Sequence, residues 1–214
     1  MNFDISLYLV TDRPLSKGRS HEYIVERAVK GGVTMVQLRE KDISTREFYE
    51  LALSLKKALE GTNVPLIIND RLDIALAVDA DGLHIGQSDM PYEVARRLLG
   101  KDKIIGLSVE TIEQAREANE LDVDYIGLSP VFDTNTKSDI NTPLGLAGIR
   151  EIAGFTKHQT VAIGGINTSN TADIIANGAD GIAVVSAIVS HDDPEAASAE
   201  LSAIINKQKQ STCS

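Results

Sequence analysis

The sequence has no tryptophan, a single cysteine, few aromatic residues and no long apolar run. The cysteine, Cys213, stands in the polar segment KQKQSTCS, which excludes an internal disulfide and disfavours a nucleophilic role. No apolar segment approaches the ~20 residues that a membrane-spanning helix needs. Positive charge is also scarce, since 21 Lys and Arg face 31 Asp and Glu, for a formal net charge of −10. Such a chain repels nucleic acid and anionic membranes, so neither is an expected partner.

The remaining composition is typical of a cytoplasmic globular protein. Hydrophobic residues make up 43% of the 214 positions, which suffices for a sizeable core in one domain. The first residues, MNFDISLYLVTD, lack a basic region followed by an apolar stretch, so we expect no secretory signal. The single cysteine also favours the cytoplasm. Because the molecule as a whole is acidic, an anionic substrate would need a local cluster of cations.

Short apolar runs alternate with amphipathic stretches along the chain. We expect strands at residues 5–11, 34–39, 65–69, 82–85, 104–108, 125–129, 160–164 and 181–186. We expect helices at 20–30, 44–59, 71–78, 91–99, 111–119, 145–153, 169–177 and 194–206, with Ser44, Thr111 and Ser169 as N-caps. This alternation predicts parallel βαβ units. The simplest architecture is a single (β/α)8 TIM barrel over residues 1–214, with a polar tail from about 207 to 214. An open doubly wound sheet is the rival, but the first turn has no GxGxxG.

The segment VTMVQLREKD, residues 33–42, places an amide and two cations where an apolar strand ends. Side chains alternate along a strand, so Gln37, Arg39 and Lys41 would share one face, and Glu40 would point away from it. Such a trio suits a multiply charged anion. The alternative is a strand followed by a solvated charge run.

Two aspartates follow neighbouring strands. Asn69 and Asp70 end the third expected strand, and Asp89 closes the loop after the fourth. Active sites of this fold lie at the carboxyl ends of the strands, and two carboxylates there suit Mg²⁺ completed by water and substrate phosphates. The alternative is that each aspartate caps the next helix.

A phosphate site is expected after the last two strands. Gly164 and Gly165 follow the seventh strand, and Val185 and Ser186 end the eighth, where this fold commonly binds phosphate. The alternative is that the glycine pair only forms a tight turn. The long loop 129–143 contributes Thr134, Thr136 and Lys137, which would suit a closing anion clamp, the alternative being a solvated polar loop.

Other polar residues give weaker signals. Ser108 has no suitably spaced histidine or lysine base, so we interpret it as a hydrogen-bonding contact. His84 is interpreted as a satisfied core residue, and His21, His158 and His191 as surface residues. Two anion sites and one metal site, without a nucleophile or an obvious base, describe transfer of an activated group from a pyrophosphate to a phosphate-bearing acceptor.

Eight motifs then connect the chain to a known family. They are YLVTD (8–12), QLREKD (37–42), IIND (67–70), ADGLHIGQSD (80–89), IGLS (105–108), SPVFDTNTK (129–137), AIGGI (162–166) and GADGIAVVSAI (178–188). In this order and spacing they closely resemble the thiamine phosphate synthase family, over nearly the whole chain. That family joins 4-amino-2-methyl-5-hydroxymethylpyrimidine diphosphate to 4-methyl-5-(2-phosphoethyl)thiazole, or to its 2-carboxy form, and requires magnesium.

The resemblance implies a role for each matching residue. Asp70 and Asp89 would ligate Mg²⁺. The pyrimidine diphosphate would be held by Gln37, Arg39, Lys41, Asn69, Ser108 and Lys137, with Arg39, Lys41, Ser108 and Lys137 acting in catalysis. The thiazole phosphate would be held by Thr134, Thr136, Gly165, Val185 and Ser186. A dissociative mechanism is implied. One departure is Ser129, which stands where the family usually has glycine.

Three rivals stay open on sequence alone. A related thiazole tautomerase should lack most of the diphosphate and magnesium residues. A sugar-phosphate isomerase, epimerase or decarboxylase would need an acid–base pair or a catalytic lysine. A non-catalytic phosphate-binding barrel would have little use for a metal pair. The expected partners are small-molecule substrates, and a homo-oligomer is compatible with the sequence.

Overall fold

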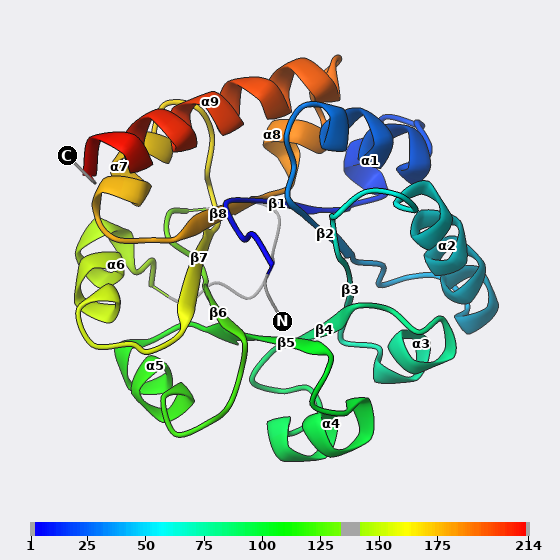
Figure 1. The fold of residues 1–214 in the computed structure, drawn as a ribbon, viewed down its shortest axis with the longest axis horizontal. Coiled ribbons are helices and arrows are strands. Elements are labelled where there is room, and N and C mark those ends of the chain that lie inside the picture. Colours follow the sequence, from blue (N-terminus) through cyan, green and yellow to red (C-terminus); the bar gives the residue numbers. More distant parts are fainter. Residues whose placement is uncertain (1–2, 134–141, 213–214) are drawn as a thin grey trace.

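The computed structural model describes residues 3–133 and 142–212, which form a closed barrel of parallel strands ringed by helices (Figure 1). Each strand pairs with the next along the chain, and β8 pairs with β1 to close the barrel. The predicted (β/α)8 TIM barrel is therefore confirmed. The strands are β1 (Leu7–Val10), β2 (Met35–Leu38), β3 (Leu66–Asn69), β4 (Gly82–Ile85), β5 (Ile104–Val109), β6 (Tyr125–Leu128), β7 (Gln159–Ile163) and β8 (Gly181–Val184).

The helices follow the strands in the expected order. They are α1 (His21–Lys30), α2 (Thr45–Ala58), α3 (Leu72–Ala77), α4 (Tyr92–Leu99), α5 (Ile112–Ala118), α6 (Gly145–Ala153), α7 (Thr171–Ala176), α8 (Ser186–Val189) and α9 (Pro194–Thr212). Two short elements were not predicted: the 3-10 helix η1 (Pro14–Ser16) and α8. The last helix continues into the polar tail as far as Thr212, because Lys and Gln favour helix.

The expected helix caps are partly confirmed. Ser44 forms a full capping box with Glu47, and the Thr111 side chain accepts a hydrogen bond from the Gln114 amide. The prediction of Ser169 as a cap is wrong. Helix α7 begins at Thr171 without a side-chain cap, because the Ser169 hydroxyl donates to Asn167 at 2.6 Å instead.

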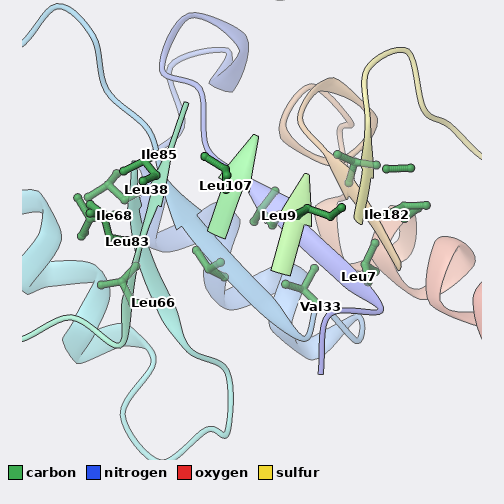
Figure 2. Packing of buried hydrophobic residues seen from close by; sticks show 14 of the residues in the cluster. Leu7, Leu9, Val33, Leu38, Leu66, Ile68, Leu83, Ile85, Leu107 and Ile182 are labelled. Atoms are coloured by element: carbon green, nitrogen blue, oxygen red, sulfur yellow. The ribbon is translucent and has the colours of Figure 1, made fainter. Parts of the chain in front are cut away.

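The strands have two buried faces. The outer face packs its aliphatic side chains against the helices, among them Leu7, Leu9, Leu38, Leu66 and Ile68 (Figure 2). The inner face changes character along the barrel. Toward the amino ends of the strands it is filled by an apolar layer, and toward the carboxyl ends it carries buried polar side chains. The apolar layer consists of Ile5, Met35, Ile67, Ile104 and Val161, and the polar residues are Gln37, Asn69 and His84.

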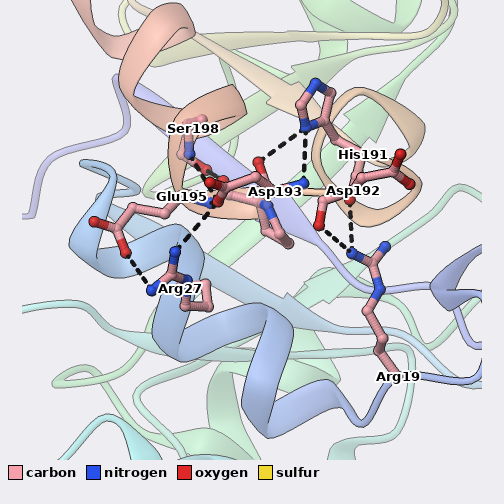
Figure 3. A network of polar contacts seen from close by, with 9 residues as sticks. Arg19, Arg27, His191, Asp192, Asp193, Glu195 and Ser198 are labelled. Atoms are coloured by element: carbon pink, nitrogen blue, oxygen red, sulfur yellow. Dashed lines mark hydrogen bonds and ion pairs between the residues drawn. The ribbon is translucent and has the colours of Figure 1, made fainter.

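Ion pairs tie the last helix to the first quarter of the chain, and so fix the segment that follows β8. Arg27 on α1 contacts Asp193 at 3.4 Å and Glu195 at 3.1 Å, while Arg19 donates to the carbonyls of His191 and Asp192 (Figure 3). A Cβ at Gly31 would lie 2.3 Å from the Glu195 carbonyl oxygen, so only glycine permits this close approach. Among the helices in the described ranges, none combines the length and apolar character needed to cross a bilayer.

Candidate active site

A cavity opens at the carboxyl ends of the strands, where sequence reasoning placed the site. It encloses about 920 Å³ of empty space, counting the part open to solvent. Seven of the predicted site residues line it: Gln37, Arg39, Asn69, Ser108, Gly165, Val185 and Ser186. Lys41, Asp70 and Asp89 form a second group beside Asn69, the last residue of β3. The predicted Thr134, Thr136 and Lys137 lie outside the described residues.

Gln37 and Arg39 face the cavity together, as strand alternation predicts. The Arg39 amide donates to the Thr11 hydroxyl at 3.0 Å, and the Arg39 guanidinium lies 3.6 Å from Asp12. Lys41 lies farther out, with its ammonium 3.2 Å from Asp70 and its side chain 56% exposed. The two cations therefore come from the same loop, Arg39 at the cavity wall and Lys41 at Asp70.

Glu40 points away from this face, as predicted, and its carboxylate is almost fully buried. It contacts Arg13 at 3.1 Å and His21 at 3.0 Å. The prediction that His21 is a surface residue is wrong, because α1 begins at this residue and turns its ring under the loop after β2. Burial lowers the pKa of His21, although the Glu40 charge partly opposes the shift. His158 is half-buried, with Nε2 2.9 Å from the Ala118 carbonyl, and His191 is exposed as expected.

Asp70 and Asp89 form a carboxylate pair that is not accounted for by N-capping of α3 or α4. Burial raises the pKa of Asp70, and the contact with Asp89 raises it further, whereas Lys41 opposes the shift. Neither α3 nor α4 has a side-chain cap, so the alternative that these aspartates are N-caps is wrong. Asp89 instead accepts from the Gly86 amide at 2.7 Å, and Asp70 adopts a left-handed conformation with φ of 59°. A bound cation would reduce the repulsion between two carboxylates held this close together.

Gly164 and Gly165 have positive φ angles of 107° and 66° and follow β7 at the cavity wall. A Cβ at Gly164 would lie 2.9 Å from Pro130, and one at Gly165 would lie 2.7 Å from the Asp133 carbonyl oxygen. The pair therefore lets the segment 130–133 pack directly on the end of β7, which is a structural requirement beyond a turn.

On the same side of the cavity, Val185 precedes the short helix α8 and Ser186 opens it. The two residues line the cavity beside the glycine pair. Ser129, the residue that departs from the usual glycine, is buried at the cavity wall, and its amide donates to the Val109 carbonyl at 3.0 Å. The peptide bond from Ser129 to Pro130 is cis. The segments after β6 and β8 thus both contribute to the cavity wall.

Sequence reasoning missed the partner of Ser108. His84, which lies 24 positions earlier on β4, places its Nε2 2.8 Å from the Ser108 hydroxyl. The other ring nitrogen, Nδ1, contacts the Tyr125 hydroxyl at 2.9 Å. His84 is thus hydrogen-bonded at both nitrogens, as expected of a satisfied core residue, but it also lines the cavity. Inward-facing polar positions on β1, β4 and β6 were the available signal for Tyr8, His84 and Tyr125.

Comparisons with known proteins agree along nearly the whole chain. A sequence model described as thiamine monophosphate synthase matches residues 7–188. Thiamine-phosphate synthase of Syntrophomonas wolfei is 57% identical over 195 residues, covering 91% of this chain and 93% of the relative. That of Clostridium novyi is 52% identical over 204 residues, covering 95% and 100%.

Solved structures extend this likeness to the fold. Thiamine phosphate pyrophosphorylase from Pyrococcus furiosus is 39% identical with a TM-score of 0.87, covering 95% of this chain and 96% of that one. A 3-hexulose-6-phosphate synthase, 18% identical with a TM-score of 0.70, shares the fold alone. From its sequence and its structure, the chain belongs to the thiamine monophosphate synthase family.

Proposed function

We propose that the protein joins 4-amino-2-methyl-5-hydroxymethylpyrimidine diphosphate to 4-methyl-5-(2-phosphoethyl)thiazole, or to its 2-carboxy form, releasing pyrophosphate and thiamine phosphate. The observation that carries this proposal is the arrangement of one cavity. Its β2 side offers Gln37 and Arg39, with Lys41 and the Asp70–Asp89 pair beside it. Its β7 and β8 side offers the glycines after β7 and the start of α8. The cavity thus accommodates two anionic groups at separate parts of its wall.

Magnesium fits the carboxylate pair. Burial raises the pKa of Asp70, and Asp89 raises it further, so the charged form of Asp70 is disfavoured, and a divalent cation at the pair would favour it. Within the described residues, no group of three or more His, Cys, Asp or Glu could hold a metal, so two carboxylates alone would anchor the ion. Magnesium commonly binds in this way, with waters and substrate phosphates completing its shell. When bound, it would neutralise charge on the departing pyrophosphate.

The residues of the chain then act by binding and orientation. Arg39 and Lys41 hold the diphosphate oxygens, on which negative charge increases as the carbon–oxygen bond to the methylene group breaks. Gln37, Asn69 and Ser108 orient the pyrimidine ring, whose amino group stabilises the resulting methylene cation. The thiazole nitrogen, placed by contacts of its phosphate with Gly165, Val185 and Ser186, supplies the electron pair of the new carbon–nitrogen bond. Lys137, Thr134 and Thr136 are proposed to complete the two anion sites.

The Ser108–His84 pair has the residue types of a catalytic nucleophile and its base. In that arrangement the second ring nitrogen is commonly oriented by a carboxylate. Here His84 Nδ1 contacts the neutral phenol of Tyr125 instead. Burial raises the pKa of Tyr125 well above its ordinary value, so this partner carries no negative charge at neutral pH. The contact favours a positioning role for the pair and supports a mechanism without covalent catalysis by serine.

The rival functions fit these residues less well. A thiazole tautomerase has no diphosphate to hold, which would leave Arg39, Lys41 and the paired aspartates without a substrate group. A non-catalytic barrel would have no need of a strained, like-charged carboxylate pair. We further propose that the enzyme works in the cytoplasm on small molecules, without nucleic acid or membrane, in keeping with its acidic charge and single cysteine.

The test is a turnover assay with purified protein and both substrates, in buffer with magnesium and in buffer with EDTA. We expect pyrophosphate and thiamine phosphate to form in equal amounts, and only when magnesium is present. Supplying the plain and the carboxylated thiazole phosphate separately identifies the acceptor. Absence of both products with magnesium present would refute the proposal.

A further inference from the structure

Five polar side chains from five strands form one hydrogen-bonded row at the floor of the cavity. Gln37 Nε2 donates to the Tyr8 hydroxyl at 2.8 Å, and the Tyr8 and Tyr125 hydroxyls are 2.9 Å apart. From Tyr125 the row continues to His84 Nδ1 at 2.9 Å, and from His84 Nε2 to Ser108 at 2.8 Å. Gln37, Tyr8, His84 and Ser108 all line the cavity, whereas Tyr125 is fully buried in the interior cluster.

The barrel makes room for this row with two strand glycines. In the register of the sheet, Gly106 lies between His84 and Tyr125. A Cβ at Gly106 would lie 2.0 Å from Tyr125 Cζ, and a Cβ at Gly127 would lie 3.3 Å from His84 Cε1. The two rings stack across this gap with centroids 5.6 Å apart and planes inclined by 27°. Glycine weakens a strand interior, so its use here indicates that the position of the rings matters.

The orientation of the Gln37 amide, together with the number of hydrogens, fixes the direction of the row. Burial raises the pKa values of both Tyr8 and Tyr125, so each phenol keeps its single proton. Because Gln37 donates to Tyr8, the proton of Tyr8 is available for Tyr125, and that of Tyr125 for His84 Nδ1. His84 then carries its ring proton on Nε2 and donates it to Ser108.

The two ends of the row consequently present opposite hydrogen-bonding groups to the cavity. The Gln37 carbonyl oxygen is left to accept a hydrogen bond, and the Ser108 hydroxyl is left to donate one. Turning the Gln37 amide over would reverse every bond in the row and exchange the two roles. In either direction, one of Gln37 and Ser108 accepts a hydrogen bond from the substrate and the other donates one. The phenols and the imidazole between them couple the two roles.

We propose that Tyr125 is a positioning residue that, through Tyr8 and His84, makes Gln37 and Ser108 present one acceptor and one donor together to the substrate ring. The inference rests on the proposed function, in which these two residues hold the pyrimidine. An aminopyrimidine matches the arrangement, because its amino group donates and its ring nitrogens accept. A ring that offers acceptors alone leaves one wall unpaired and binds more weakly.

The first test needs no substrate. In protein with ¹⁵N-labelled histidine, NMR of the wild type should show His84 as a single tautomer, with its proton on Nε2 when Gln37 donates to Tyr8, assigned by comparison with His84→Gln. Tyr125→Phe keeps the ring but removes the hydroxyl that contacts Nδ1, so the row no longer selects one tautomer and both should become populated. Tyr8→Phe separates Tyr125 from Gln37, so it should also populate both tautomers, whereas Tyr92→Phe, on the outer surface of the barrel, should leave the His84 signals unchanged. Mixed tautomers in the wild type, or unchanged signals in Tyr125→Phe, would overturn the proposal.

The second test measures the link between the two walls. We expect Tyr125→Phe and Tyr8→Phe each to lower kcat/KM for the pyrimidine diphosphate by about tenfold. The effects of Gln37→Met and Ser108→Ala should be non-additive in the wild type and closer to additive in both tyrosine variants. Tyr92→Phe is the matched control, because it loses a hydroxyl bonded to the Asp122 carbonyl on the outer surface of α4.

These outcomes separate the two proposals. If the wild type forms no product, the proposed function fails while the NMR result still decides the role of Tyr125. If the wild type turns over but additivity is the same in every background, the positioning role fails while the proposed function stands. Circular dichroism and thermal unfolding verify that each variant is folded, and Tyr8→Phe still tests the link between the walls if Tyr125→Phe does not fold.

Discussion

Replacing Asp89 with asparagine separates the metal-binding role of this carboxylate from its structural role. Asp89 Oδ2 accepts a hydrogen bond from the Gly86 amide at 2.7 Å, and the same side chain repels Asp70. An asparagine oxygen can still accept from Gly86, so only the charge is lost. Asp89→Ala removes both the charge and the acceptor. The two variants together therefore distinguish a metal ligand from a loop-stabilising residue.

The expected magnitudes follow from these contacts. Asp89→Asn should change the free energy of unfolding by less than about 1 kcal/mol, because the hydrogen bond to Gly86 remains and the repulsion of Asp70 disappears. Asp89→Ala should cost about 1–3 kcal/mol, because it leaves the Gly86 amide without its partner. Loss of a charged ligand weakens cation binding by about 1.5–3 kcal/mol, so both variants should need roughly 10- to 100-fold more magnesium for half-maximal turnover.

The assay combines a magnesium titration of pyrophosphate release with urea unfolding in EDTA, performed on the wild type and both variants. Unfolding without metal measures the contribution of Asp89 to the free energy of unfolding. The titration measures its contribution to magnesium binding. An unchanged magnesium requirement in Asp89→Asn would refute the assignment of Asp89 as a ligand. Equal destabilisation of the two variants would refute the argument from the Gly86 hydrogen bond.

Two further predictions concern stability. Gly106→Ala should destabilise the protein by about 3 kcal/mol in urea unfolding, because its Cβ would lie 2.0 Å from Tyr125, and an effect no larger than that of the helical control Gly148→Ala would contradict this. The pKa of His21 is lowered by burial, so the unfolded chain binds more protons than the folded protein just below pH 6.5. Stability should therefore fall as the pH decreases from about 7 to 5.5, and less steeply in His21→Gln; parallel curves for the two proteins would exclude this origin.

The fold could be predicted from the sequence because its signals are local. Apolar runs and helical spacing located every strand of the barrel, although several ends moved; the run expected at 34–39, for example, is regular only over Met35–Leu38. The two missed elements, η1 and α8, have three and four residues, which is too short for helical periodicity to be visible. Ser169 failed as a cap because its hydroxyl found a closer acceptor in Asn167.

The site was predictable where it depends on a single strand. Gln37 and Arg39 face the cavity because alternation along β2 requires it. The contact of His84 with Ser108, by contrast, depends on the register between β4 and β5, which pairs His84 with Gly106. Nothing in the spacing of the sequence gives that register. The burial of His21 was missed for a similar reason, since its partner Glu40 comes from another βα unit.

Arg39 and Glu40 are neighbours that face opposite ways, so the charge presented to the cavity depends on which of the two positions points inward. Arg39 faces the cavity, while Glu40 turns away to Arg13 and His21. Deleting one residue just before Arg39 would leave the composition almost unchanged, yet it would bring the acid to the inward position and carry the base outward. A site for anions would become one that repels them. In this loop, chain length is therefore under as strict a chemical constraint as residue identity, and we expect natural variation here to exchange residues and to avoid single insertions or deletions.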